Sequence, residues 1–397
     1  MSENKDNYKD LQPGERLLLG PGPSNVPDRV LRALSVPCIG HLDPEFLTIM
    51  DETQQLLRFV FQTQNPFTIP VSGTGSAGME TCFVNLIEPG DGVAVCINGV
   101  FGNRMADIVQ RLGGRLIRID APWGRALNPD RVQDSLRGKQ VKILAVVHAE
   151  TSTGVCQPLE DLAMIARDAG ALFLVDCVTS LGGMPVSLDA LGIDAAYSGT
   201  QKCLSCPPGL APLSFGIRAI EALEKRKTPV TSWYLDMTMV RSYWDQERKY
   251  HHTAPVNMIY GLREALRLIF EEGLEERFAR HRLNHQALVA GLEAMGLEML
   301  VPEAERLLTL NAVRIPAGAD DLKVRRALLT EFGIEIGGGL GELAGKIWRV
   351  GLMGHSSQKK NVLLFLSALE TILQAEGIPI GPGAAAAAEV WAGKKIL

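Results

Sequence analysis

The sequence predicts an α/β protein with a large, mostly parallel, doubly wound sheet and a smaller α/β unit towards its C-terminal end. Between residues 68 and 176, short apolar runs alternate with amphipathic segments at helical spacing, which is typical of a parallel sheet. After Gly296 the alternation resumes on a smaller scale. A chain of 397 residues is long enough for two or three domains. We expect an arm at 1–25, a large domain at 26–272, a small domain at 273–378 and a tail at 379–397.

Composition and charge exclude several classes of protein. With 46% hydrophobic and 21% charged residues the chain resembles ordinary globular proteins, and its net charge of −5 argues against nucleic-acid binding. No apolar run approaches the roughly 18 residues of a membrane helix, and the first residues lack a signal peptide's apolar core, so we expect a cytoplasmic protein without a membrane anchor. The seven scattered cysteines indicate reduced thiols. Cys203 and Cys206 lack further ligands at zinc spacing, so no metal site is expected.

Each element is predicted from a short pattern. The expected strands are apolar runs bounded by turn-forming residues, at 68–71, 93–97, 115–119, 143–147, 171–175, 307–315, 334–336 and 347–350. The expected helices have apolar side chains three or four residues apart, at 27–34, 44–61, 79–86, 103–112, 129–136, 159–168, 258–270, 274–295, 322–332 and 361–375. The charges around Arg277 and Arg280 predict a solvated helix face.

Asp176 and Lys202 carry the strongest chemical signal. Asp176 ends the apolar run 171–175, and open parallel sheets bind ligands beyond the carboxyl ends of their strands. Lys202 follows at a turn marked by Pro207-Pro208-Gly209. A lysine that can form a Schiff base and an aspartate that can pair with a protonated pyridine nitrogen suit pyridoxal phosphate (PLP). A solvated lysine and a helix-capping aspartate remain the alternatives.

A glycine-rich turn offers a second possible chemistry. Residues 73–78 match G-x-G-x-x-G after a strand and before a helix, so a nicotinamide-dependent oxidoreductase is the alternative from another class. That class requires an acidic residue at the end of the next strand, which here ends Ile97-Asn98-Gly99. The turn still presents free N–H groups and a helix N-terminus to a phosphate. Thr74 and Ser76 add hydroxyl groups to it.

Three more residues follow strand ends or lie in apolar surroundings. Thr151 lies beyond the strand at 143–147, where its hydroxyl would face the same crevice or cap a turn. Phe101, beyond the strand at 93–97, could stack on a planar ring or pack in the core. Arg349 is flanked by apolar residues and could bind a carboxylate through its planar fork, or form an internal salt bridge.

Taken together, these motifs resemble the alanine–glyoxylate aminotransferases, which are class-V, fold-type-I PLP enzymes. The resemblance runs from Leu17 to about residue 375 and includes Ser152-Thr153-Gly154, Ser198-Gly199-Thr200-Gln201-Lys202 and Tyr250-His251-His252-Thr253. It implies transfer of an amino group from alanine or serine to glyoxylate, giving glycine and a 2-oxo acid. The chain beyond Gly377 is similar to the (S)-ureidoglycine–glyoxylate branch, which is therefore the alternative. A PLP desulfurase is disfavoured, because Cys203 and Cys206 lie too close to Lys202 to reach a substrate sulfur.

The resemblance also implies roles by position. Lys202 corresponds to the Schiff-base lysine and Asp176 to the partner of the pyridine nitrogen. The implied phosphate cradle consists of Thr74, Gly75, Ser76 and Gln201, and the second subunit of a homodimer adds Tyr250 and Thr253. Phe101 and Val178 correspond to the residues on the two ring faces, and Thr151 corresponds to the hydroxyl beside the cofactor oxygen. Among the implied substrate contacts, Arg349 corresponds to the carboxylate clamp. Gly22 and Ser180 are implied contacts near the lysine, and His41 and Asn257 are the two candidates for setting the amino donor.

Overall fold

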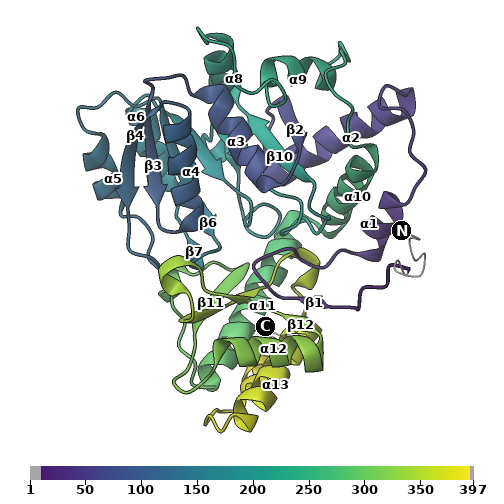
Figure 1. Cartoon of the computed structure of the whole chain (residues 1–397), viewed down its shortest axis with the longest axis vertical. Helices are drawn as coiled ribbons and strands as arrows, with labels where there is room; N and C mark the ends of the chain where they lie inside the picture. The colour runs from purple at the N-terminus through teal and green to yellow at the C-terminus, as the bar shows by residue number, and fades with distance from the viewer. Residues whose placement is uncertain (1–9, 394–397) are drawn as a thin grey trace, which may run out of the picture.

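The computed structural model describes residues 10–393, and a seven-stranded sheet forms the centre of its larger part (Figure 1). Six of the seven strands run in the same direction, and β10 runs against both of its neighbours. The prediction of an α/β fold with a large, mostly parallel sheet is confirmed. In spatial order the strands are β2 (Phe67–Ser72), β10 (Leu210–Phe215), β9 (Ala195–Tyr197), β8 (Leu172–Asp176), β5 (Ile143–Val147), β3 (Gly92–Ile97) and β4 (Arg115–Asp120).

The carboxyl ends of six strands lie at one edge of this sheet. Strands β2, β9, β8, β5, β3 and β4 all point that way, and every residue of β3, β5 and β8 is buried, as expected for strands covered on both faces. The chain runs outward from β3 to β4 and then returns to β5 on the other side of β3. Such a reversal of strand order is where open α/β sheets bind ligands.

Helices connect the strands of the larger part. Asp43 and Asn128 precede two of these helices, and each accepts a hydrogen bond from a first-turn N–H while proline occupies the first turn. These helices are α1 (Asp28–Leu34), α2 (Pro44–Phe61), α3 (Gly75–Leu86), α4 (Val100–Arg111), α5 (Pro129–Leu136), α6 (Glu160–Asp168), α7 (Leu188–Leu191), α8 (Ile217–Glu224), α9 (Met237–Trp244) and α10 (Val256–Glu272). A short ribbon joins β6 (Ala149–Glu150) to β7 (Val155–Cys156).

A second, smaller unit lies below the large sheet in the view of Figure 1. Its antiparallel sheet has the order β11 (Leu310–Arg314), β14 (Ile347–Gly351) and β13 (Gly337–Gly338). Its helices are α11 (Leu274–Ala294), η2 (Glu303–Glu305), α12 (Asp321–Phe332), η3 (Gly341–Leu343), η4 (Gly354–Ser356), α13 (Lys359–Ala375) and α14 (Gly383–Gly393). Strand β1 (Leu17–Leu18) pairs with β12 (Ile334–Glu335), which brings the N-terminal segment against this unit. The proposed domain boundaries stay a prediction.

Three features differ from the sequence-based expectation. The central strand β10 was not predicted, because Pro212 lies in its middle and proline usually indicates an edge strand. The alanine-rich tail forms α14, where Trp391 donates a hydrogen bond to Asn284 of α11 across 3.3 Å. The predicted solvated face at Arg277 is wrong, since that residue is only 5% exposed. Within residues 10–393, no helix combines the length and apolar character needed to span a membrane.

Candidate active site

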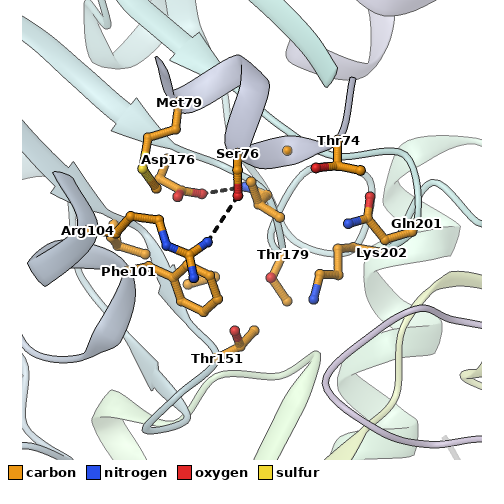
Figure 2. A pocket seen from close by; sticks show the side chains of 14 residues that line it. Thr74, Ser76, Met79, Phe101, Arg104, Thr151, Asp176, Thr179, Gln201 and Lys202 are labelled. Carbon is orange, nitrogen blue, oxygen red and sulfur yellow. Dashed lines mark hydrogen bonds between the residues drawn. The ribbon is translucent and has the colours of Figure 1, made fainter. Parts of the chain in front are cut away.

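A cavity of about 210 Å³ lies where the parallel strands end (Figure 2). Nine of the residues singled out from the sequence line it, namely Thr74, Gly75, Ser76, Phe101, Thr151, Asp176, Val178, Gln201 and Lys202. The lining residues that were not predicted are Met79, Arg104, Val147, Ala149 and Thr179. Segments that are far apart in the sequence therefore meet at one edge of the sheet.

Asp176 is the last residue of β8 and its carboxylate is held by two hydrogen bonds. Its Oδ1 accepts from the backbone N–H of Val178 at 2.8 Å, and its Oδ2 accepts from the hydroxyl of Tyr197 at 2.7 Å. Burial raises the pKa of Asp176 to about 6, although both hydrogen bonds oppose that rise. Tyr197 is itself fully buried, so the carboxylate has little freedom to rotate.

Lys202 lies on a different side of the cavity from Asp176 (Figure 2). Its Nζ donates to the carbonyl of Pro21, and its own carbonyl accepts from the hydroxyl of Ser24 at 2.7 Å. Gly22 has a φ of +107°, and a Cβ at this position would approach Lys202 Nζ to 2.5 Å, so only glycine fits there. Burial lowers the pKa of Lys202 to about 8. A fraction of this amine is therefore neutral near pH 7.

The N-terminus of α3 is open towards the cavity. The backbone N–H groups of Gly75 and Ser76 have no acceptor among residues 10–393, and the first turn carries no acidic side chain. The Oε1 atom of Gln201 is buried without a hydrogen-bond partner in the same range, so this acceptor is open to a hydrogen-bond donor of a ligand. Free N–H groups and the helix dipole attract an anion such as a phosphate.

Phe101 lies in the first turn of α4, which a buried carboxylate caps. The Oε2 atom of Glu150 accepts from the N–H groups of Phe101 and Gly102 at 3.1 and 3.3 Å. Arg104 lies one turn further along α4, with its Cζ 5.0 Å from the centroid of the Phe101 ring, and it donates to Ser76 Oγ at 3.0 Å. Helical spacing from Phe101 is the signal that could have identified Arg104.

Arg349 is 6% exposed and lies beside the cavity. Its Nε donates to the carbonyl of Gly338 at 2.7 Å and its Nη1 to the carbonyl of Thr151 at 3.1 Å. No carboxylate of the described chain forms an ion pair with it, so the alternative of an internal salt bridge is not found there. Burial lowers the pKa of Arg349 to about 10. The remaining N–H groups can bind an external carboxylate.

Besides Gly22 and Arg349, which lie next to the cavity, five predicted residues do not line the cavity of this chain. Tyr250 is 55% exposed, Thr253 is exposed, and the His41 ring lies 5.3 Å from the Tyr250 ring. Asn257 donates to two backbone carbonyls at and just after the end of α1, at 3.0 and 2.7 Å. Ser180 is fully buried, and its hydroxyl lacks a partner among residues 10–393.

The cysteines near Lys202 have structural contacts. Cys203 and Cys206 are both free and buried, and the Cys203 thiol donates to the carbonyl of Thr179 at 3.2 Å. Burial raises the pKa of Cys203 to about 11, so this thiol stays protonated near pH 7. The described residues contain no group of three or more His, Cys, Asp or Glu side chains that could hold a metal ion.

A family model described as Aminotransferase class-V matches residues 17–351. The chain belongs to this family. The identification as a PLP-dependent aminotransferase is therefore confirmed at the level of the family, whose members use PLP.

Individual relatives extend the similarity over almost the whole chain. The (S)-ureidoglycine–glyoxylate transaminase of Bacillus subtilis is 41% identical over 95% of each chain. The alanine–glyoxylate aminotransferase of Callithrix jacchus is 42% identical over 92% of this chain and 89% of its own. The crystal structure of an alanine–glyoxylate aminotransferase from Nostoc sp. has a TM-score of 0.92 and 51% identity, and covers 94% of this chain and 99% of its own. The cavity at the carboxyl ends of the strands thus lies within a class-V aminotransferase fold.

Proposed function

We propose that this protein transfers the amino group of a small amino acid, alanine or serine, to glyoxylate, giving glycine and a 2-oxo acid. One observation carries the proposal: Asp176 and the partly neutral Lys202 line a single cavity that ends at an open helix N-terminus. Relatives named for glyoxylate transamination support the acceptor.

The residues around the cavity fit PLP in several ways. The unpaired N–H groups at the start of α3, together with the Thr74 hydroxyl and the side-chain N–H groups of Gln201, suit its phosphate. Phe101 and Val178 suit its ring faces, Thr151 its ring hydroxyl and Asp176 its pyridine nitrogen. When bound, PLP supplies an aldehyde that condenses with amines and a ring that accepts the electron pair left at the substrate Cα.

The chain itself supplies proton transfer and orientation. When neutral, Lys202 Nζ would take the proton from the substrate Cα and then deliver it to the carbon that came from the PLP aldehyde, acting as general base and then as general acid. The negative charge of the Asp176 carboxylate, which Tyr197 orients, would keep a proton on the ring nitrogen. Arg349 binds the substrate carboxylate and thereby directs the Cα–H bond towards Lys202. Gly22 allows the N-terminal loop to cover the amine.

The proposal includes a homodimer whose two cavities each receive residues from the other subunit. Tyr250 and Thr253 are exposed and do not line the cavity of their own chain, which supports a role across an interface. Trp233 and Tyr234 are 62% and 43% exposed, and the Trp233 ring stacks on His251 with its centroid 4.3 Å away. Exposed aromatic side chains of this kind are enriched in protein–protein interfaces.

(S)-ureidoglycine is the second candidate for the amino donor. The Bacillus subtilis relative of that name matches 95% of this chain, against 92% for the Callithrix jacchus relative. In this alternative His41 and Asn257 are the candidates for recognising the donor. The Asn257 amide already binds two carbonyls, so His41, which packs beside Tyr250, is the better placed of the two at the proposed interface.

Donor and mechanism are tested together. The purified protein, loaded with PLP, is incubated with glyoxylate and each of alanine, serine and (S)-ureidoglycine, and glycine formation is followed. The Lys202→Ala variant is expected to lose turnover and the visible absorbance of the lysine-bound cofactor. Lys139→Ala, at an exposed lysine, serves as the control. Normal transamination by Lys202→Ala would refute the assignment of the catalytic lysine.

A further inference from the structure

We propose that Arg277, in the first turn of α11, is a positioning residue that sets the spacing between Asp176 and Lys202. The inference rests on the proposed function, since it concerns the two residues that flank the cofactor site. Arg277 does not line the cavity, and it lies behind the loops that carry both groups. Its effect on the reaction is therefore indirect.

The Arg277 guanidinium binds three separate pieces of the chain. Its Nε donates to the carbonyl of Gly182, in the loop after Asp176, at 2.6 Å. Its Nη2 donates to the carbonyl of Cys203, the residue after Lys202, at 2.6 Å. Its Nη1 donates to Glu272 Oε2 at 2.6 Å. One rigid, planar group thus fixes the distance between the two loops.

The sheet does not fix this distance by itself. Strands β8 and β9 pair from Leu174↔Ala195 up to Asp176↔Tyr197, where their ladder ends. Just beyond that point, the Ser198 hydroxyl still links the two loops by donating to the carbonyl of Cys177 at 3.2 Å. The thiol of Cys203, which donates to Thr179 at 3.2 Å, is one further link between them. A thiol is a weak donor, so Arg277 is the stronger of these two bridges.

Glu272, the last residue of α10, makes the burial of Arg277 possible. Arg277 is 5% exposed, and a buried guanidinium requires a paired anion. The Glu272 carboxylate accepts from Arg277 on one oxygen and from Arg280 Nε on the other, each at 2.6 Å. The carboxylate thereby holds the Arg277 fork in register with both carbonyl groups.

Arg280 provides an internal comparison. It lies on the same helix and shares Glu272, but its Nη1 donates to the carbonyl groups of Gly354 and Ser357, at 3.0 and 2.5 Å. Those carbonyl groups belong to η4 and the residue that follows it, in the second unit. The two arginines therefore differ mainly in what they hold: Arg277 holds the loops of Asp176 and Lys202, and Arg280 holds the second unit.

The test compares Arg277→Met, Arg277→Lys and Arg280→Met in the full chain loaded with PLP. The exposed Arg282 of the same helix, as Arg282→Met, controls for the substitution itself. Three quantities are measured: the pH midpoint of the visible absorbance of the lysine-bound cofactor, kcat per bound cofactor, and the melting temperature. The first two report on Lys202 and Asp176, whereas a purely structural role changes only the third.

Arg277→Met is expected to lower kcat about 10- to 100-fold, because a misplacement of roughly 1 Å at a reacting group can cost about 100-fold. Its absorbance midpoint is expected to move by about half a pH unit or more, since the two charges change their separation. Arg277→Lys keeps the positive charge but not the planar guanidinium. Its melting temperature is therefore expected to return towards the wild-type value, whereas its absorbance midpoint stays shifted as in Arg277→Met. Arg280→Met is expected to lower the melting temperature and leave the midpoint and kcat within about twofold of wild type.

An unchanged midpoint and kcat in Arg277→Met overturns the inference, as does an equal effect of Arg280→Met. If Arg277→Met does not fold, Arg277→Lys decides, and a wild-type midpoint in that variant overturns the inference. Failure of the proposed function has a different signature, because the wild-type protein would then form no glycine from glyoxylate with any of the three donors.

Discussion

The hydroxyl of Tyr197 offers a direct test of how the site controls Asp176. Tyr197→Phe removes a 2.7 Å hydrogen bond between two fully buried side chains and leaves the ring in place. A hydrogen bond to a charged group contributes about 1.5–3 kcal/mol and one between neutral groups about 1 kcal/mol. The loss is therefore about 0.5–2 kcal/mol larger when Asp176 is ionised. At about 1.4 kcal/mol per pKa unit, the pKa of Asp176 rises by roughly 0.4–1.5 units.

The sign of the pH dependence follows from the direction of this shift. Burial holds the pKa of Asp176 at about 6, above its usual 3.8, so the folded protein binds the proton more tightly than the unfolded chain. Asp176 therefore destabilises the fold progressively as pH rises from about 4 to about 6. In Tyr197→Phe the loss of stability that comes from ionising Asp176 continues above pH 6. The difference in stability between this variant and wild type therefore grows between pH 6 and pH 7.5.

Melting temperatures of the cofactor-free proteins between pH 5 and pH 8 provide the assay. Tyr197→Phe is expected to lie slightly below wild type at pH 5 and further below it at pH 8. The same substitution in an Asp176→Asn background, where no charge forms, is expected to give a difference that does not change with pH. A constant difference in the Asp176 background would refute the claim that Tyr197 acts on the ionised carboxylate.

Two further predictions concern the substrate clamp and the dimer. Arg349→Met is expected to raise KM for glyoxylate and KM for the amino donor about 100-fold each, because both substrate carboxylates lose the same two N–H donors. If steady-state kinetics show a higher KM for only one of the two substrates, the carboxylate clamp is not shared. Mixing Lys202→Ala with Tyr250→Ala is expected to give more activity than either variant alone, since a mixed dimer contains one cavity with both residues intact. Mass spectrometry verifies that mixed dimers have formed. If activity does not increase once they have, the site is not shared between subunits.

The sequence predicts the regular parts of the large sheet well, for a physical reason. Strand β5 and helices α2 and α5 begin and end where their patterns predict, because buried parallel strands and capped amphipathic helices depend on local residue choice. Strand β10 depends instead on its two neighbours: Pro212 lies opposite Pro70 of β2 in the antiparallel pair. Only the three-dimensional pairing makes this apolar segment a central strand.

The residues of the candidate site also differ in how far the sequence predicts them, depending on whether local or distant residues position them. Residues placed by strand ends, such as Asp176 and Thr151, are predictable because the end of a strand is visible as the end of an apolar run. Tyr197 and Arg277 are not predictable in their roles, because their partners come from distant parts of the sequence. A lone arginine in a charged helical stretch usually faces solvent, and here the carbonyl groups of Gly182 and Cys203, together with the Glu272 carboxylate, reverse that expectation.

The unpaired groups of the cavity suggest how ligand binding and stability are coupled. In the proposed complex, the N–H groups at the start of α3 would bind the phosphate of PLP and the amine of Lys202 would bind its aldehyde. In Lys202→Ala, PLP is still expected to raise the melting temperature through its phosphate, whereas pyridoxal, which lacks the phosphate, is expected to have little effect. In wild type both ligands stabilise the protein, and PLP does so at lower concentration. Equal stabilisation of Lys202→Ala by PLP and pyridoxal would mean that the open end of α3 does not bind the phosphate, because the phosphate is the group that pyridoxal lacks.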